Sequence, residues 1–383
     1  MIIQIQARNF RSLAEVSVRL GALTVLVGPN GSGKSNLVDV LRFLSEALQR
    51  GLDAAIIERH GMSALRRWSA KGRPYDIEIH LTLEEDGKWA EYSFILGSER
   101  RGEYRVKHEL CRVGRSAAMI EHEFETREGE WIRSQPGLNA PILPTALALP
   151  LAAGVPAFKW IYDFIVGMGF YVIFPNVLRE PQKPANPYPL DEHGQNLASV
   201  LREIKRAQNP WLPDVQRALS KVVEDVTDFQ VTQVGGYLVT RLRHSSQEDR
   251  SPTFELSQES DGTLRILGLL AALFQDPPRT LIAMEEPELT MHPGAMGLLC
   301  DVLSESTRRS QILITTHSPD LIARFGADEL RVVEKVEGST VIGEVDEAQR
   351  TAINEKLFSP GDLLRLDGSL RRAMPAAQEK SHA

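Results

Sequence analysis

One stretch near the amino terminus, Gly28-Pro29-Asn30-Gly31-Ser32-Gly33-Lys34-Ser35, constrains the fold more than any other part of the sequence. It fits the phosphate-binding loop pattern G-x-x-x-x-G-K-[ST] at every fixed position. The apolar run 23–27 before it predicts a buried strand, and the apolar residues at helical spacing in 35–49 predict a helix. Strand, glycine loop and helix together are the context that a phosphate-binding loop requires.

The loop residues predict a nucleotide site. Glycines let the chain wrap a phosphate with backbone N–H groups pointing inward, and the start of a helix adds free N–H groups and a positive dipole end. We expect Lys34 to neutralise the β- and γ-phosphates and Ser35 to place its hydroxyl on Mg²⁺. Arg11 is a further candidate phosphate contact, with a solvated surface arginine as the alternative. The predicted nucleotide contacts of the loop are Asn30, Gly31, Ser32, Gly33, Lys34, Ser35 and Asn36.

Two later apolar strands deliver polar residues at their carboxyl ends. The run 280–284 ends in two acidic residues, of which we expect Glu285 to hold a Mg²⁺ water and Glu286 to orient and polarise the attacking water. The run 311–314 leads to His317, which is placed to sense a γ-phosphate. An acidic surface cluster and a capping or core histidine are the alternatives.

Two residues upstream complete the candidate site. Ser260 and Gly262 precede an apolar helix at 264–274, where they would form a second anion site. A simple helix cap is the alternative interpretation of this pair.

Composition excludes a membrane protein and a disulfide-stapled one. The chain has 383 residues, 42% hydrophobic residues and a net charge of -7. Its two cysteines, Cys111 and Cys300, offer neither a disulfide framework nor a metal-ligand cluster, which predicts a reducing cytoplasm. The most apolar region, 141–174, is interrupted by prolines and charges, so it contains no clean span of about 20 apolar residues.

Periodicity divides the chain into five segments. Alternation in 75–132, with a turn at Asp86-Gly87, predicts an antiparallel β insertion. Further expected elements are helices in 141–170, 191–207 and 215–226, a core strand at 171–174, and hairpins around Gly235-Gly236 and Gly338. The predicted segments are 1–60 (first part of the nucleotide-binding lobe), 61–140 (β insertion), 141–250 (helical and mixed insertion), 251–371 (second part of the lobe) and 372–383 (tail).

In this order, the glycine loop, long insertion, Ser260 segment, acidic strand and histidine strand resemble the ATPase heads of the ABC/SMC/RecF superfamily. A closer resemblance is to the bacterial and archaeal AAA ATPases related to the OLD (overcoming lysogenization defect) family. That resemblance covers most of the chain. The residues that carry it are Asn9-Phe10-Arg11-Ser12, Ser260-Asp261-Gly262-Thr263-Leu264-Arg265, Glu285-Glu286-Pro287-Glu288 with His292-Pro293, and Thr315-Thr316-His317-Ser318-Pro319.

The resemblance implies an α/β P-loop NTPase fold of the ABC-head type, with a mixed central sheet, an antiparallel β insertion and a helical lobe. It implies ATP and Mg²⁺ as ligands. It also implies that Ser260 and Gly262 contact the γ-phosphate bound by a second subunit, so that ATP joins a head-to-tail homodimer and hydrolysis releases it.

The sequence also departs from the family pattern. Glu285-Glu286 stands where most ABC proteins have Asp-Glu, and neither a glutamine loop nor a coiled-coil arm is found. The Toprim nuclease domain of OLD proteins is not expected, because too few residues follow Gly338 for a domain of about 100 residues.

Three functions compete at this point. One is an ATPase in a DNA-linked process, either repair or anti-phage defence; a second is a regulatory ATPase that controls a separate effector protein or toxin. A soluble transporter subunit fits less well, because the insertion is large and the signature is Ser-Asp-Gly-Thr. Basic clusters at 59–73 and 100–115 favour the first, although a solvated face explains them too. The candidate nucleic-acid face comprises Arg66, Arg67, Arg100 and Arg101.

Overall fold

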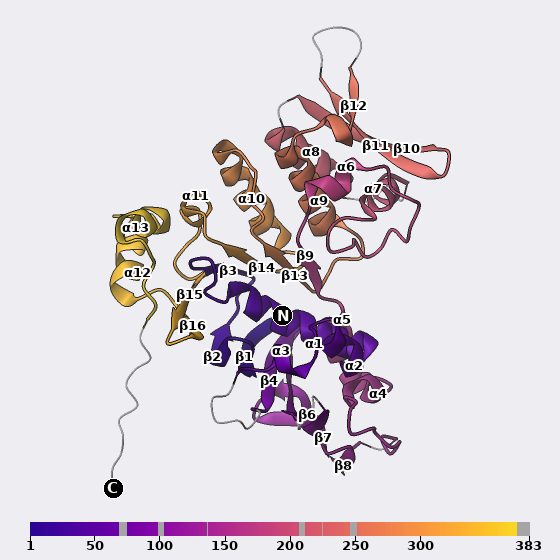
Figure 1. Ribbon diagram of the computed structural model, residues 1–383, viewed down its shortest axis with the longest axis vertical. Helices are drawn as coiled ribbons and strands as arrows, with labels where there is room; N and C mark the ends of the chain where they lie inside the picture. Colours follow the sequence, from indigo (N-terminus) through magenta and orange to yellow (C-terminus); the bar gives the residue numbers. More distant parts are fainter. Residues whose placement is uncertain are drawn as a thin grey trace. The chain divides into compact units, whose positions relative to one another are not determined.

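The computed structural model of the chain describes residues 1–68, 75–98, 103–135, 137–206, 211–223, 225–245 and 251–373 (Figure 1). It divides into two compact units, of which unit 1 comprises Met1–Met168 and Gly326–Ala383 and unit 2 comprises Gly169–Phe325. These units cut across the five segments expected from the sequence, whose boundaries stay predictions.

Unit 1 is built on a mixed sheet whose strands follow the order β8-β7-β6-β5-β4-β1-β2-β16-β15-β3. Its amino-terminal elements are β1 (Ile2–Phe10), β2 (Leu13–Arg19), β3 (Leu23–Val27), α1 (Lys34–Arg50), α2 (Leu52–Ile57) and α3 (Met62–Leu65). Its middle elements are β4 (Ile77–Glu85), β5 (Lys88–Ser98), β6 (Tyr104–Ser116), β7 (Met119–Arg127), β8 (Glu130–Arg133), α4 (Leu149–Ala152) and α5 (Pro156–Val166). Its carboxyl-terminal elements are β15 (Leu330–Val336), β16 (Ser339–Gly343), α12 (Glu347–Asn354) and α13 (Pro360–Asp367).

The strand that leads into the glycine loop is fully buried. Every residue of β3 is buried, and α1 buries the apolar face that the sequence predicted. Next to β3 lies β15, which runs parallel to it, and β16 runs parallel to β2. The expected hairpin around Gly338 is therefore present, and it lies inside the sheet between β2 and β3.

The β insertion forms as predicted and continues the same sheet. Strands β4 to β8 pair antiparallel in sequence order, and β4 pairs with β1. The Asp86-Gly87 turn has positive φ angles of 50° and 75°, which suit a tight hairpin. Alternate residues of β4 are buried, so one face of the insertion packs inward and the other is polar.

A buried carboxylate joins the insertion to the segment at α4. Glu109 on β6 is fully buried and accepts hydrogen bonds from the backbone N–H groups of Ala148 and Leu149 and from the hydroxyl of Tyr92. Burial raises the pKa of Glu109 to about 7, and these three hydrogen bonds oppose the rise.

Unit 2 holds three parallel strands in the order β14-β13-β9 and a separate antiparallel sheet, β10-β11-β12. Helices α7 and α8 pack on β10 (Figure 1). Its elements are β9 (Gly169–Tyr171), α6 (Pro175–Arg179), α7 (Leu197–Arg206), α8 (Leu212–Val222), β10 (Val226–Val234), β11 (Tyr237–His244), β12 (Thr253–Glu255), η2 (Leu256–Gln258), α9 (Asp261–Phe274), β13 (Leu281–Glu285), η3 (Pro293–Ala295), α10 (Met296–Ser306), β14 (Gln311–Thr316) and α11 (Pro319–Ile322).

Three predicted elements of unit 2 are partly wrong. The helix expected at 191–207 begins only at Leu197, as α7. The strand expected at 171–174 is observed as β9, which ends at Tyr171. The backbone N–H of Val172 donates to the carbonyl of Glu192 instead, and Pro175 begins α6. The helix expected at 215–226 ends at Val222, and its last predicted residue, Val226, begins β10. Of the described helices, none combines the length and apolarity needed to cross a bilayer.

Candidate nucleotide site

The glycine loop in unit 1 has backbone geometry that only glycine adopts easily. Gly31 and Gly33 have φ angles of 77° and 106°. A Cβ atom on Gly33 would lie 2.0 Å from the Thr340 hydroxyl, and one on Gly28 would lie 2.1 Å from the carbonyl oxygen of Val333. The loop therefore packs closely against β15 and β16, and at Gly28 and Gly33 there is no room for a side chain between the loop and these strands.

A continuous chain of hydrogen bonds holds the loop in place. The Thr340 hydroxyl donates to the carbonyl of Ser32 at 2.7 Å, so the 2.6 Å contact between Ser12 and Thr340 uses the proton of Ser12. Asn36 completes the chain by donating its side-chain amide to Ser12 at 2.6 Å. Each hydroxyl in the chain both donates and accepts, an arrangement in which neighbouring bonds strengthen one another.

Lys34 lies folded over the loop. Its ammonium donates to the carbonyls of Gly28 at 2.7 Å and Pro29 at 3.1 Å, and the residue is 6% exposed. Ser35 and Asn30, by contrast, are exposed. The ammonium is thus at the mouth of the loop, where it can exchange backbone carbonyls for phosphate oxygens.

The loop contains a buried polar atom that is suited to bind a phosphate. Ser32 is 2% exposed, and its hydroxyl oxygen has no hydrogen-bond partner within the described part of the chain. Together with the glycine cradle, this orphaned hydroxyl fits a bound phosphate.

Arg11 is engaged with α1. Its guanidinium lies 3.0 Å from a carboxylate oxygen of Asp39, while its side chain stays 37% exposed. The same carboxylate pairs with Arg59 at 2.8 Å. The ion pair of Arg11 that the structure shows is with α1, and its assignment to the nucleotide stays a prediction. Asn36 has the same status, because its side chain holds Ser12.

Unit 2 brings together the predicted catalytic pair. Glu286 follows β13 with a φ of 44°, and its backbone N–H donates to the carbonyl of Thr315 at 2.9 Å. Its carboxylate lies 2.7 Å from Nδ1 of His317, which stands just after β14. Because β13 and β14 are parallel neighbours, their carboxyl ends present Glu285, Glu286 and His317 at one edge of the sheet.

The signature residues lie at the start of α9, also in unit 2. Ser260 caps the helix by accepting from the backbone N–H of Thr263 at 3.2 Å, so the helix-cap interpretation is correct for its side chain. Ser260 is exposed. A Cβ on Gly262 would lie 3.0 Å from the carbonyl oxygen of Thr290, so α9 begins directly against the segment after β13.

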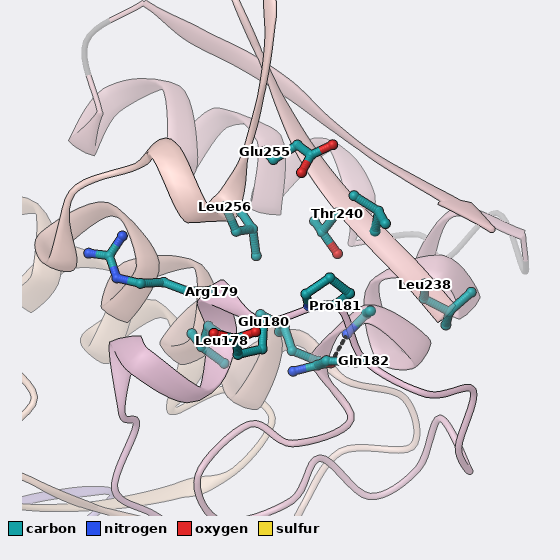
Figure 2. A pocket seen from close by; sticks show the side chains of 12 residues that line it. Leu178, Arg179, Glu180, Pro181, Gln182, Leu238, Thr240, Glu255 and Leu256 are labelled. Carbon is teal, nitrogen blue, oxygen red and sulfur yellow. Dashed lines mark hydrogen bonds between the residues drawn. The ribbon is translucent and has the colours of Figure 1, made fainter. Parts of the chain in front are cut away.

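Arg179, the last residue of α6, binds the segment around Ser260 and so holds it in place. This role was not predicted from the sequence. The guanidinium of Arg179 donates to the carbonyl of Glu259 at 2.8 Å and to the carboxylate of Asp261. Arg179 also lines a small pocket together with its neighbours in 178–182, β11 and Leu256, and Figure 2 shows its guanidinium pointing away from the other labelled side chains of that pocket. Arg179 belongs to a proline-rich stretch without periodicity, which gave no signal for its role.

Several residues of the basic clusters at 59–73 and 100–115 are paired with carboxylates. Arg59 is 6% exposed and pairs with Asp39 and Glu46, so it is a buried structural residue. On β6, each basic residue lies beside a carboxylate: Arg105 beside Glu128, Lys107 beside Asp76, Arg112 beside Glu91 and Glu123, and Arg115 beside Glu121. Arg100 and Arg101 lie outside the described residues.

The residues predicted to hold Mg²⁺ have suitable chemistry. Ser35 offers a hydroxyl and Glu285 a carboxylate, which are the hard oxygen ligands that Mg²⁺ prefers. Mg²⁺ keeps several waters and is usually held by one or two protein groups plus substrate phosphates, so two protein ligands suffice. Ser35 belongs to unit 1 and Glu285 to unit 2.

Comparison with known proteins identifies related sequences. Residues 23–139 and 170–323 match the family described as AAA domain, putative AbiEii toxin, Type IV TA system. The OLD nuclease of Thermus scotoductus is 23% identical over 92% of this chain and 66% of its own length. The Old nuclease of Escherichia phage P2 is 24% identical over 91% of this chain and 60% of its own length. The chain thus spans less than two thirds of these relatives.

Solved structures agree on the fold. The Smc head domain with an extended coiled coil, bound to the C-terminal domain of ScpA and derived from Pyrococcus furiosus, superposes with a TM-score of 0.57 at 13% identity, covering 93% of this chain and 99% of that chain. The SmcHead bound to the C-winged helix domain of ScpA gives a TM-score of 0.55, also at 13% identity, covering 92% and 99%. The predicted α/β fold of the ABC-head type, with a large mixed sheet and helices, is confirmed.

Proposed function

We infer the function from a family assignment: this chain belongs to the AAA-domain family, because the family match covers well over half of its length. Its fold and relatives are those of P-loop ATPases of the ABC/SMC type related to OLD nucleases. We propose that the chain binds ATP with Mg²⁺ and hydrolyses it. The observation that supports this most is the ordered glycine loop, with Lys34 at its mouth and an orphaned Ser32 hydroxyl inside.

Each residue in the proposed site has a distinct task. Lys34 neutralises phosphate charge, and Glu286 orients and polarises the attacking water. His317, which touches Glu286, senses the γ-phosphate and fixes the orientation of that carboxylate. Ser35 and Glu285 would hold Mg²⁺, which supplies further charge neutralisation on the phosphates.

Removing Lys34 tests the nucleotide site. Lys34→Ala should abolish ATP binding in isothermal titration, because it deletes the cation of the loop. A variant that binds ATP with wild-type affinity would disprove the site. Lys159→Ala is a matched control, because Lys159 is an exposed lysine of unit 1 that pairs only with Asp163, on its own helix, among the described residues.

ATP-dependent dimerisation is the finer part of the proposal. Ser260 is exposed at a helix N-terminus, so it is accessible to a phosphate carried by a second subunit. Glu286→Gln keeps the size of the side chain but cannot accept a proton from water, so ATP should stay bound. We expect this variant to shift from monomer to dimer in ATP, but not in ADP, by light scattering.

A second substitution checks that the dimer uses the signature surface. Adding Ser260→Arg to the Glu286→Gln variant should restore the monomer, because it places a long charged side chain in the interface. A Glu286→Gln protein that stays monomeric at saturating ATP contradicts the head-to-tail dimer. So does Ser260→Arg alone if its turnover equals that of the wild type.

Two processes are proposed for this ATPase. The first is a cytoplasmic DNA-linked process, repair or anti-phage defence, which the similarity to two OLD nucleases supports. The second is control of a separate effector protein, which the pairing of the β6 basic residues with carboxylates favours. Both cysteines are free and buried, as suits a reducing compartment.

A further inference from the structure

The ring of His317 is exposed, so packing alone does not orient it. The side chain is 43% exposed, and its Nδ1 lies 2.7 Å from a carboxylate oxygen of Glu286, whose side chain is 24% exposed. The residue before His317 is, by contrast, wholly buried, since Thr316 ends β14 and is 0% exposed. The position of the imidazole therefore depends on how the backbone on either side of His317 is held.

The hydroxyl of Thr316 holds that backbone. It accepts a hydrogen bond from the backbone N–H of Ser318 at 3.0 Å, which closes a tight turn around His317. It donates its own proton to the carboxylate of Glu288. Ser318 in turn caps α11 by accepting from the backbone N–H of Leu321 at 3.4 Å. One hydroxyl thus ties the residue after His317 to the acidic segment that follows β13.

The acidic segment is bound to the end of β14 at two points. Glu286 adopts a φ of 44°, in the left-handed region that few residues other than glycine occupy, and such a conformation persists only where the surroundings hold it. Its backbone N–H donates to the carbonyl of Thr315 at 2.9 Å, and its carbonyl accepts from the N–H of Leu289 at 3.2 Å. The carboxylate of Glu288 makes the second attachment, to Thr316. The two attachments together fix where the Glu286 carboxylate lies.

Glu288 depends on this attachment because it is buried. It is 5% exposed, and its second carboxylate oxygen has no hydrogen-bond partner among the residues that the structure describes. Burial of a carboxylate is costly unless hydrogen bonds compensate for the lost water. Loss of the Thr316 hydroxyl would therefore drive the Glu288 side chain toward water, and the turn that contains Glu286 would move with it.

We propose that Thr316 and Glu288 are positioning residues for hydrolysis, because their hydrogen bond holds His317 and Glu286 in contact. The inference rests on the proposed ATPase function and deepens it, since neither residue is assigned a contact with nucleotide. The pair acts on the step in which Glu286 polarises water, whereas the glycine loop of unit 1 holds ATP. Its loss should therefore lower turnover and leave ATP binding intact.

Substitutions that remove the hydrogen bond should affect kcat alone. We expect Thr316→Val and Glu288→Leu each to lower kcat by about tenfold or more, with KM for ATP changed by less than about twofold. Thr316→Ser keeps the hydroxyl and should retain kcat within about threefold of the wild type. Ser306→Ala is the matched control, because Ser306 on α10 is 2% exposed and donates its hydroxyl to the carbonyl of Val302 at 2.8 Å, and it should leave kcat unchanged. A loss confined to KM, or equal losses of kcat in Thr316→Ser or Ser306→Ala, would overturn the positioning role.

Replacing both partners distinguishes positioning from a purely structural bond. Thr316→Val combined with Glu288→Leu leaves neither partner unpaired, so its thermal stability should return toward that of the wild type. Its kcat should stay at the level of the slower single variant, because either change alone removes the same hydrogen bond. Turnover that recovers together with stability, or losses of kcat that multiply, would contradict the proposal.

The placement of His317 can also be followed by nuclear magnetic resonance without any turnover. In protein with isotope-labelled histidine, the ring signal of His317 is the one lost in His317→Ala, and it should shift in Glu286→Gln, which changes the partner of Nδ1. We expect Thr316→Val to move this signal in the same direction and Thr316→Ser to leave it in place. An unshifted signal in Thr316→Val refutes the positioning role whether or not the protein hydrolyses ATP. A wild-type protein without turnover, in which the signal behaves as expected, refutes the proposed function alone.

Discussion

Replacing Thr340 by valine should weaken ATP binding although Thr340 lies 308 positions from the loop residue that it holds. The substitution keeps the shape of the side chain but removes the hydroxyl at the centre of the Asn36–Ser12–Thr340–Ser32 chain. The carbonyl of Ser32 then loses its donor, and the hydroxyl of Ser12 loses its acceptor. The new methyl group also lies where the loop approaches most closely, at Gly33.

The size of the effect follows from these losses. Leaving a buried polar group unsatisfied costs about 1 to 3 kcal/mol, and Thr340 is 1% exposed. If about 2 kcal/mol of this cost has to be overcome to order the loop before a phosphate binds, the affinity for ATP falls about thirtyfold. Thr340→Ser keeps the hydroxyl and should bind ATP within about threefold of the wild type.

Isothermal titration with ATP measures the effect directly. Thr24→Val is the control, because Thr24 is also 1% exposed, lies on β3, and uses its hydroxyl to hold Gly21 at the far end of that strand. Thr24→Val should lower stability without a comparable loss of ATP affinity. Equal affinity in Thr340→Val and the wild type, or an equal loss in Thr340→Ser, would refute the role of the hydrogen-bond chain.

Two further predictions concern unit 1. Gly33→Ala should bind no ATP in the same titration, because the added Cβ would lie 2.0 Å from the Thr340 hydroxyl at a φ of 106°; measurable wild-type affinity would contradict the loop geometry. The pKa of Glu109 is about 7 in the folded protein, above its ordinary value of 4.5, so between these pH values the folded state binds a proton that the unfolded state has lost. The free energy of unfolding therefore falls by about 3 kcal/mol as the pH rises from 4.5 to 7. Glu109→Gln cannot titrate and should lack this part of the pH slope in urea unfolding; identical slopes in both proteins would argue against the raised pKa.

Local parts of the site were predictable because their signals are contiguous. The glycine loop, the strand before it and the helix after it occupy one short stretch, and the observed β3 and α1 agree with the prediction. Glu286 and His317 were each predicted from the end of an apolar strand, and parallel pairing of those strands brings the two side chains within 2.7 Å.

The supports of the site were not predictable, because each depends on pairing across long sequence distances. Thr340 belongs to the hairpin predicted around Gly338, and only the place of that hairpin between β2 and β3 brings Thr340 against the loop. Glu288 and Arg265 lie in two of the segments that carry the family resemblance, but their burial depends on how α9 packs. Arg59 was grouped with surface cations because its partners, Asp39 and Glu46, lie 20 and 13 positions earlier, on α1, and only the fold brings them together.

The proposed nucleic-acid face is the part of the functional interpretation that the fold weakens most. A cation contributes to DNA affinity when phosphate contact releases counterions, and a cation already held by a carboxylate releases fewer. Arg67 is engaged as well, since it donates to the hydroxyl of Ser339 at 2.6 Å, next to Thr340. Free cations for DNA are therefore scarcer on the described part of unit 1 than the sequence indicated.

Charge reversal decides between DNA and a separate effector. Changing Arg66, Arg67, Arg100 and Arg101 together to glutamate should weaken DNA binding at low salt and leave basal ATPase intact, if this face binds DNA. The control reverses four exposed basic residues elsewhere, Lys221, Arg308, Lys335 and Lys356, and matches the change in net charge. If this face binds DNA, the logarithm of the DNA-binding constant decreases with the logarithm of the salt concentration by about 0.9 per phosphate contact. This slope should become smaller in the first variant and stay unchanged in the control. Electrostatic binding to DNA is strongest at low salt. If the unmodified protein binds no DNA there, the proposal of a DNA-linked process is refuted, and the partner to identify is a separate effector protein.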